Sequence, residues 1–351
     1  MEGMLDSHGP AGLALASLSP EQIIFIKRLP KAELHAHLNG SIPISCLQQL
    51  ARDFDISSLD STLAGSIRDT LSVLQDGVQL NEIGDFFGLF PAIYALTSTP
   101  QALATVTRSV LDSFLSPPSD GALPQCTYLE LRSTPRSTDD MSRKEYLLAI
   151  LGEIESYPHG EAALIVSIDR RMDVKTVEEC VELAIELRST GHAVVGVDLC
   201  GDPTKGDMTT FRPLMERARL SGLGLTVHIA ETKENSDTGE ILSWVPHRLG
   251  HATFLNPEEM EIVADSRMAI EICLSSNLLC KTVPRLEDHH LHGWLARNHP
   301  LIICSDDTLP FRTTLTAEYA LLLASPPLGL GLTKEAVRKL AEGGLQSRFS
   351  R

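Results

Sequence analysis

Short apolar runs alternate with longer amphipathic stretches over most of the chain. The runs are rich in β-branched residues and end in polar residues or glycine; they lie at 31–37, 127–134, 163–170, 194–201, 224–231, 248–253, 269–277 and 301–307. Helical spacing of apolar residues is clearest at 143–156, 174–189 and 211–221, and shorter at 239–245 and 257–264. Near-continuous hydrophobic strands joined by helices are typical of a parallel sheet. Eight such units predict an α/β fold, a (β/α)₈ TIM barrel.

An open, doubly wound sheet is the alternative arrangement of these elements. It would carry a Gly-x-Gly-x-x-Gly turn after one strand if it bound a dinucleotide, and no such turn follows any of the runs. The barrel is therefore favoured. In a barrel the active site lies at the carboxyl ends of the strands, so polar residues at these ends are the candidates for site residues.

The segment between the first two strands is too long for an ordinary crossover. Residues 42–126 show helical spacing throughout, which predicts a helical lid over a pocket, with the apolar stretch 86–90 and Tyr94 facing a planar ligand. We expect residues 1–18 to be a loose tail and a last helix at about 333–347 to close the barrel. The whole chain, 1–351, is predicted to be one catalytic domain.

Composition narrows the function. The formal net charge of −16 argues against a nucleic-acid partner, because phosphate backbones need Lys and Arg surfaces. No apolar run approaches the ~18 residues of a membrane span, and the N-terminal stretch lacks the basic region of a signal peptide. The seven cysteines are scattered without a Cys-x-x-Cys pair, as in a reduced, cytoplasmic protein. We therefore expect a cytoplasmic enzyme for a small molecule, acting as a monomer.

Metal-ligand residues follow several of the predicted strands. His35 and His37 are two apart on the first strand, so both side chains project from one face. His228 lies near the end of the fifth strand, His251 ends the sixth, and Asp306 ends the eighth. Three imidazoles and a carboxylate, from His35, His37, His228 and Asp306, suit Zn²⁺. Bound zinc lowers the pKa of a water towards 7 and so supplies hydroxide, for which His251 is the natural base.

Two acidic residues fit this site only if their strands end early. Glu231 is three residues from His228, and on a continuing strand it would face the opposite side. We therefore predict that the fifth strand ends near Ile229 and that Glu231 curls over the mouth. Asp306 and Asp307 are adjacent, so the eighth strand should also end there, with one carboxylate reaching the metal and the other the substrate.

These residues stand in a set of motifs that resembles the adenosine deaminase family in the family's own order. The resemblance covers about residues 28–345 and rests on LHAHLNGS (34–41), HIAE (228–231), RLGHA (248–252), EICLSSN (271–277) and SDD (305–307). It implies a hydrolase for an aminopurine, with one zinc per chain on the four ligands above. Leu274 stands where the family usually has proline, which affects the shape of a turn more than the chemistry.

The resemblance also implies a role for each remaining site residue. Glu231 would protonate purine N1, His251 would orient and deprotonate the water, and Asp307 would contact N7. Hydroxide would then attack C6 and expel the amine. The backbone of Gly201 would meet N3, and His37 would touch the substrate as well as the metal. Glu231 must be protonated at neutral pH for this, which a water-excluded pocket favours.

One departure concerns the sugar end of the ligand. Adenosine deaminases proper carry Asp where this chain has Asn39, and that acid meets the ribose 5′-hydroxyl. A neutral amide would not repel a 5′-phosphate. Two hydroxyls and two guanidinium groups end the second strand and could hold such a phosphate: Arg132, Ser133, Thr134 and Arg136. Arg170 and Arg171, after the third strand, add positive charge nearby. The resemblance implies that Ser133, Thr134, Pro135, Arg136 and Asp169 line the nucleotide end, with Tyr94 in the lid.

LHAHLNGS together with YLELRSTPR (128–136) resembles the adenosine deaminase-like subgroup, whose members convert N6-methyl-AMP to IMP and methylamine. We therefore expect a purine nucleotide substrate. Three alternatives stay open: a deaminase that releases ammonia from adenosine or AMP, a non-catalytic purine-binding member of the family, and a binuclear amidohydrolase. The last would need a bridging Lys or carboxylate after the fourth strand, where the chain reads Asp198, Leu199, Cys200 and Gly201.

Overall fold

A computed structural model describes residues 7–53, 61–76, 78, 88–117, 123–234 and 236–349. Part of the apolar stretch 86–90, including Phe86 and Phe87, lies outside these residues. No helix in the described part of the chain is both long enough and apolar enough to cross a membrane.

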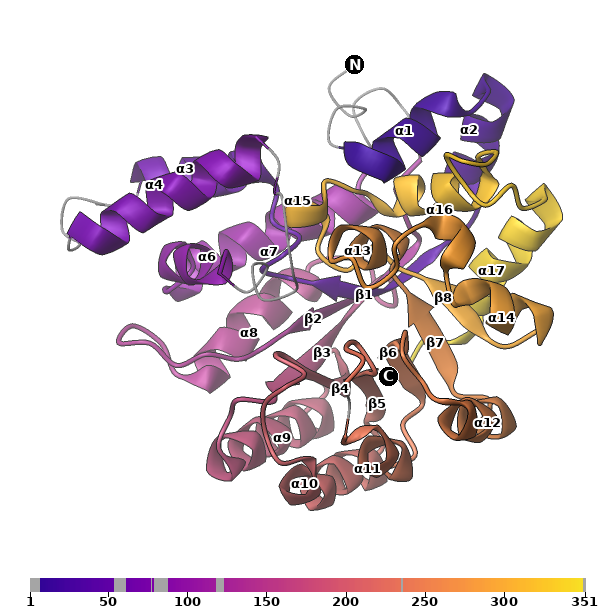
Figure 1. Cartoon of the computed structure of the whole chain (residues 1–351). Helices are drawn as coiled ribbons and strands as arrows, with labels where there is room; N and C mark the ends of the chain where they lie inside the picture. The colour runs from indigo at the N-terminus through magenta and orange to yellow at the C-terminus, as the bar shows by residue number, and fades with distance from the viewer. Residues whose placement is uncertain are drawn as a thin grey trace.

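Eight parallel strands pair in sequence order, as predicted, and form a TIM barrel (Figure 1). They are β1 Ala32–His37, β2 Tyr128–Ser133, β3 Ala162–Asp169, β4 Val194–Cys200, β5 Gly224–Ile229, β6 Arg248–His251, β7 Ala269–Ile272 and β8 Leu301–Ile303. Hydrogen bonds between β1 and the residues just after β8 join the ends of the sheet: Asp306 N donates to His35 O (2.9 Å) and His37 N donates to Asp306 O (3.2 Å). Three predicted zinc ligands therefore also close the barrel.

Helices surround the strands, and several of them begin at a capping side chain. They include α8 Arg143–Ile154, α9 Val174–Ser189, α10 Met208–Leu220, α11 Thr238–Ser243, α12 Pro257–Ser266, α14 Leu291–Ala296, α16 Leu315–Leu323 and α17 Lys334–Gln346. Ser142 and Asn256 form capping boxes at α8 and α12, and Asp173 accepts from Thr176 N at α9. Apart from α14 and α16, which the sequence analysis did not predict, these are the predicted helices, including the last one.

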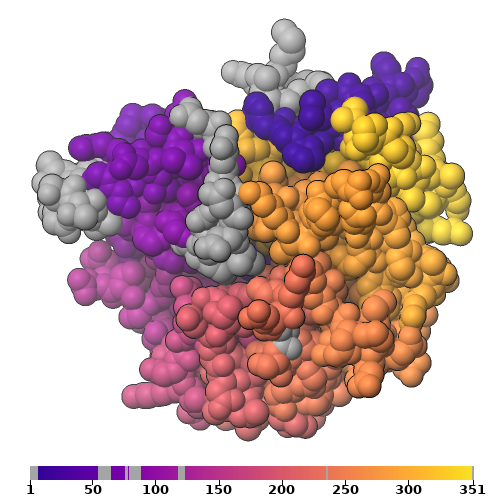
Figure 2. Space-filling model, in the orientation of Figure 1, coloured from indigo at the N-terminus to yellow at the C-terminus, as the bar shows by residue number. Residues whose placement is uncertain are grey.

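The insertion after β1 is helical where it is described. It contains α3 Ile44–Asp53, α4 Ser61–Asp76, α6 Phe90–Leu96 and α7 Pro100–Leu115. Space-filling atoms show α3 and α4, in purple, projecting from one side of the barrel (Figure 2). That the insertion acts as a lid stays a prediction.

The N-terminal tail differs from the expectation. Residues expected to be loose form α1 Gly9–Ser17, which is followed by α2 Pro20–Arg28. Ala11 and Ala14 are buried, and α1 packs against α16. Small side chains on one helical face let two helices approach closely, and the alanine-rich run from 11 to 16 provides that face.

The seventh apolar run also differs. The strand β7 ends at Ile272, and residues predicted to continue it form α13 Leu274–Leu279. The buried carboxylate of Glu318 accepts a hydrogen bond from Ser275 N in the first turn of α13 (3.1 Å). Because the first N–H groups of a helix have no partner within it, this contact from α16 stabilises a helix that the local pattern does not indicate.

The barrel interior is only partly apolar. Leu34, Ile165, Val195 and Ile302 are among the buried side chains of its inner cluster, but buried charged residues share the space, among them Glu33, Glu130, Arg132, Arg248 and Glu271. At the amino ends of the strands, Phe349 lies over the opening. Its ring is 3.7 Å from the Arg248 guanidinium carbon, and a Cβ on Gly224 would lie 2.3 Å from it.

Candidate active site

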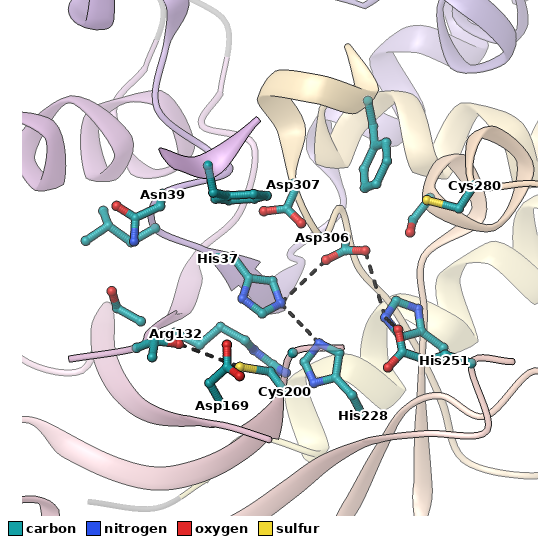
Figure 3. A pocket seen from close by; sticks show the side chains of 18 of the residues that line it. His37, Asn39, Arg132, Asp169, Cys200, His228, His251, Cys280, Asp306 and Asp307 are labelled. Carbon is teal, nitrogen blue, oxygen red and sulfur yellow. Dashed lines mark hydrogen bonds and ion pairs between the residues drawn. The ribbon is translucent and has the colours of Figure 1, made fainter. Parts of the chain in front are cut away.

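The four predicted metal ligands converge at the carboxyl edge of the barrel, and Figure 3 shows three of them, His37, His228 and Asp306, pointing toward one another. His37 Nε2 is 3.1 Å from His228 Nε2. Asp306 Oδ1 is 3.5 Å from His35 Nε2 and 3.6 Å from His37 Nε2. The ligands come from β1, β5 and the turn after β8, which are far apart in the sequence. They meet because these parallel strands all end at the same edge of the barrel.

Hydrogen bonds fix which nitrogen of each imidazole faces the centre. His35 Nδ1 lies 2.6 Å from Glu271 Oε2. His228 Nδ1 lies 2.9 Å from Leu199 O and 3.0 Å from Asp198 Oδ1. Acceptors on Nδ1 hold a proton there, so Nε2 of His35 and of His228 is the nitrogen that a metal ion would take.

A cation fits this arrangement. His35 Nε2 is buried and has no hydrogen-bond partner, so this nitrogen remains available to a metal ion. Nitrogen and carboxylate donors together suit zinc. Three clusters of histidine, cysteine or carboxylate side chains in the described part of the chain could hold a metal ion. Each cluster contains at least one of the four predicted ligands.

A buried ion-pair network supports His35 from below. Glu271 Oε2 also accepts from Arg132 Nη2 (2.9 Å), and Glu271 Oε1 is 2.7 Å from Arg248 Nε. Burial by itself would raise the pKa of Glu271, but the two guanidinium groups outweigh it and hold that pKa well below its usual range. Glu271 therefore stays ionised and keeps the proton on His35 Nδ1.

Glu231 turns into the mouth of the barrel as predicted. The strand β5 ends at Ile229, and Ala230 takes a left-handed φ of 52°. Burial raises the pKa of Glu231, and its Oε1 is buried without a partner. The other oxygen is 3.8 Å from His251 Nε2. Burial also lowers the pKa of His251 to about 3, so this imidazole is neutral beside a carboxyl that favours its protonated form.

The two adjacent aspartates point in different directions, because Asp306 has a φ of 63°. Burial, with Asp306 alongside, raises the pKa of Asp307 well above its usual range. Asp307 Oδ1 is buried without a partner. Gly40 makes room for it: a Cβ at that position would lie 1.4 Å from Asp307 Oδ1. The glycine of the first motif thus allows the carboxylate of the last one to reach the site.

The ligand centre opens into a cavity of about 100 Å³. The sequence-predicted residues that line it are His37, Asn39, Tyr94, Arg132, Ser133, Thr134, Asp169, Arg171, Gly201, His228, Glu231, His251, Asp306 and Asp307. Gly201 has a φ of +95°, and a Cβ there would lie 2.7 Å from the Asp169 carboxylate. A glycine at position 201 therefore leaves the backbone on this wall accessible to a ligand in the cavity.

Pro135 and Arg136 are not among the lining residues. The Arg136 guanidinium donates to Tyr94 O (3.2 Å) and Thr97 Oγ1 (2.9 Å), and it lies 4.3 Å from the Tyr94 ring centroid. It therefore braces helix α6 against β2.

The other arginines expected near a phosphate have protein partners too. Arg132 is fully buried and pairs with Glu271 and Asp198. Arg170 pairs with Asp237 Oδ2 at 2.5 Å, and Arg171 with Asp169 Oδ2 at 2.5 Å. The charges of these arginines are therefore already balanced by acidic residues of the protein. The sequence pattern shows which residues lie near the edge of the barrel, but it does not show which acidic residues they contact.

Sequence reasoning missed several residues of the cavity. Phe311, Ser276 and Cys280 line it. Ser276 lies on α13, in a segment that the sequence pattern predicts to be a strand, and Cys280 is the C-cap of that helix. Tyr146 lies directly behind the wall, where its hydroxyl contacts Ser133 Oγ (2.7 Å); nothing in the spacing of α8 indicates this contact.

A parallel barrel with histidine and carboxylate donors at its carboxyl edge, beside a buried carboxyl group, defines a barrel hydrolase whose site suits a metal ion. Comparison with known proteins gives the family. A family described as adenosine deaminase matches residues 30–351. The chain belongs to the adenosine deaminase family, and it is a hydrolytic deaminase that acts on carbon–nitrogen bonds.

Particular relatives cover almost the whole chain. Adenosine deaminase-like protein of Drosophila melanogaster is 37% identical over 89% of this chain and 91% of its own length. N6-mAMP deaminase of Arabidopsis thaliana is 33% identical over 93% and 94%. Crystal structures of Arabidopsis ADAL complexed with IMP and with GMP each match with a TM-score of 0.82 at 33% identity, over 93% of this chain and 94% of theirs.

Proposed function

We propose that this enzyme hydrolyses N6-methyl-AMP to IMP and methylamine, with one zinc ion per chain. The observation that carries the proposal is the cavity itself. One end holds the converged donors beside a protonatable Glu231, and the other holds the neutral polar side chains of Asn39, Ser133 and Thr134. The relative named N6-mAMP deaminase and the structures complexed with IMP and GMP support a nucleotide ligand.

His35, His37, His228 and Asp306 would hold the zinc ion. Bound zinc lowers the pKa of a coordinated water and makes hydroxide available near neutral pH. Asp198 would not serve a second metal, because it is fully buried and already contacts both Arg132 and His228. This supports a mononuclear site over the binuclear alternative. Metal analysis should give one zinc per chain; two would contradict the proposal.

The remaining side chains would act on the purine. Glu231 donates its proton to N1, which makes C6 electrophilic. His251, neutral in its buried position, accepts a proton from the attacking water. The water oxygen adds to C6, the C6–N6 bond breaks, and methylamine leaves with a proton. Asp307, whose pKa is raised by burial, would donate to N7, and the Gly201 backbone would meet N3.

A substrate panel tests the proposal. Adenosine, AMP, N6-methyladenosine and N6-methyl-AMP should be compared by the absorbance change on conversion to the inosine product. We expect the highest kcat/KM for N6-methyl-AMP, and nucleotides should exceed the matching nucleosides. Preference for AMP would leave the class of reaction standing and correct the leaving group. A lack of turnover with all four, in zinc-loaded protein, would favour a purine-binding function.

A further inference from the structure

A short chain of hydrogen bonds runs behind the wall at the sugar end of the cavity. Asn39 Nδ2 donates to the Tyr146 hydroxyl (3.3 Å), and that hydroxyl lies 2.7 Å from Ser133 Oγ. Asn39 and Ser133 line the cavity, whereas Tyr146 does not. All three are buried, and Tyr146 has no exposed surface. Tyr146 therefore connects two ligand-facing groups, one just after β1 and the other at the end of β2.

The Tyr146 hydroxyl has only one hydrogen to give, so the chain has a direction. Asn39 Nδ2 donates to this hydroxyl, and of its two partners only Ser133 Oγ can accept its hydrogen. A buried hydroxyl hydrogen without an acceptor is costly, so the favoured arrangement has Tyr146 donating to Ser133 Oγ. The hydrogen of Ser133 is then free to point into the cavity. Asn39 Oδ1 is buried without a partner, which leaves an acceptor for the ligand as well. The wall thus offers one hydroxyl donor and one amide acceptor, as a sugar phosphate requires.

A carboxylate at position 39 would reverse this chain. It has no hydrogen to donate, so the Tyr146 hydroxyl would turn its hydrogen to the carboxylate. Tyr146 would then accept from Ser133, and the hydrogen of Ser133 would no longer reach the ligand. A carboxylate would therefore remove a phosphate donor at Ser133 in addition to placing a negative charge nearby.

We propose that Tyr146 is a positioning residue that sets the choice between nucleotide and nucleoside by coupling residue 39 to Ser133. The inference rests on the proposed function. The position of the ring supports it: the Arg136 guanidinium lies 5.4 Å from the Tyr146 ring centroid and 4.3 Å from that of Tyr94. The Arg136 guanidinium restrains the Tyr146 ring, so the Tyr146 hydroxyl stays between Asn39 and Ser133 in either orientation of its hydrogen.

The test is whether substitutions at positions 39 and 133 are additive. Ser133→Ala should lower kcat/KM for N6-methyl-AMP roughly tenfold, which is typical of losing a hydrogen bond to a charged group. In an Asn39→Asp background the same change should cost less than about threefold, because Ser133 already donates to Tyr146. Adding Tyr146→Phe to Asn39→Asp should restore the roughly tenfold cost, since Phe accepts nothing from Ser133.

Nucleoside turnover provides the reference within each variant. kcat/KM for N6-methyladenosine should change less than about threefold for Ser133→Ala, with the nucleotide effect falling on KM. Tyr319→Phe, which removes another buried phenol hydroxyl away from the cavity lining, is the control for nonspecific loss of stability. Thermal unfolding and zinc content should be measured for every variant.

The outcomes separate the two proposals. Suppose that the enzyme prefers nucleotides but that Ser133→Ala lowers kcat/KM for N6-methyl-AMP by the same factor with and without Asn39→Asp. That result would overturn the role of Tyr146 and leave the proposed function standing. The role of Tyr146 would also be overturned if, in the Asn39→Asp background, Ser133→Ala lowered kcat/KM for N6-methyl-AMP by the same factor with Tyr146 present and with Tyr146→Phe. An enzyme that prefers nucleosides would overturn the proposed function, and the inference would fall with it.

Discussion

The chemical state of each functional side chain depends on its immediate neighbour. Glu271 sets the tautomer of His35, and Asp198 with Leu199 O sets that of His228. Glu231 differs because it lacks such a partner on one oxygen, and burial raises its pKa. A carboxyl group in this state can carry a proton near neutral pH and give it to a base that it touches.

Glu231→Gln tests this role directly. The amide is almost isosteric but cannot transfer a proton, so kcat should fall at least ~100-fold. Zinc content and thermal unfolding should stay close to those of the unsubstituted enzyme, since Glu231 is not a proposed ligand. Near-normal turnover would remove Glu231 from the mechanism.

The pH dependence follows from the direction of the shift. Because the pKa of Glu231 is raised, its protonated form persists to higher pH than that of an ordinary glutamate. Activity that needs the proton should therefore decline as pH rises through this raised pKa. We expect an alkaline limb in kcat/KM that is absent from the residual activity of Glu231→Gln; an unchanged limb in the variant would assign it to another group.

The turns that end the strands decide where the side chains point. Ala230, His251, Ala252 and Asp306 all have positive φ although none is glycine. Such residues cost of order 1–3 kcal/mol each and persist only where surrounding contacts hold them. One such contact at β6 is visible: His290 Nε2 donates to His251 O at 2.8 Å. Burial lowers the pKa of His290 to about 4, so it acts as a neutral donor.

Removing that contact should affect catalysis more than substrate binding. We expect His290→Ala to lower kcat about tenfold with little change in KM, because His251 would lose its fixed orientation. His290→Gln retains an N–H donor and should recover much of the loss. If both variants lose the same activity while unfolding at the normal temperature, the hydrogen bond to His251 O is not the cause.

At the scale of the whole molecule, the site and the closure of the barrel are one structure. The hydrogen bonds that join β1 to the turn after β8 involve the backbone of His35, His37 and Asp306. A metal ion on these side chains would therefore link the first and last strands as well as serve the reaction. Binding to the folded state alone stabilises it by mass action.

Chelation should accordingly remove activity and stability together. Treatment with a chelator followed by dialysis should abolish turnover and lower the unfolding temperature, and added zinc should restore both. Asp306→Asn offers a comparison, because it weakens the donor set and should make the unfolding temperature insensitive to the chelator. A chelated enzyme that keeps its activity would contradict the proposed zinc.

The opposite end of the barrel depends on Phe349. The Phe349 N–H donates to Glu130 Oε1 (2.7 Å), and Arg248 joins Glu130 to Glu271. Because the ring is half-buried, Phe349→Ala should lower the free energy of unfolding by about 2 kcal/mol, less than a fully buried Phe. Urea denaturation would measure this, with the exposed Leu220→Ala expected within about 0.5 kcal/mol of the unsubstituted protein. Equal changes in both would indicate that Phe349 does not close the barrel.

The sequence by itself determined the barrel and the composition of its catalytic edge. Alternating strands and helices predict a parallel barrel, and parallel strands align their carboxyl ends, so His35, His228, His251 and Asp306 had to meet. The early end of β5 at Ile229 also followed, because Glu231 could face the site in no other way.

Only the tertiary structure decided which polar side chains remain available to a ligand. Arg132 and Arg136 look alike in the sequence, yet one is neutralised by Glu271 and Asp198 and the other braces α6. Tyr146 contacts Asn39 across 107 residues of chain. Local periodicity fixes the edge that a residue reaches, but its hydrogen-bond partner comes from a distant element, and that partner determines whether the residue can bind substrate.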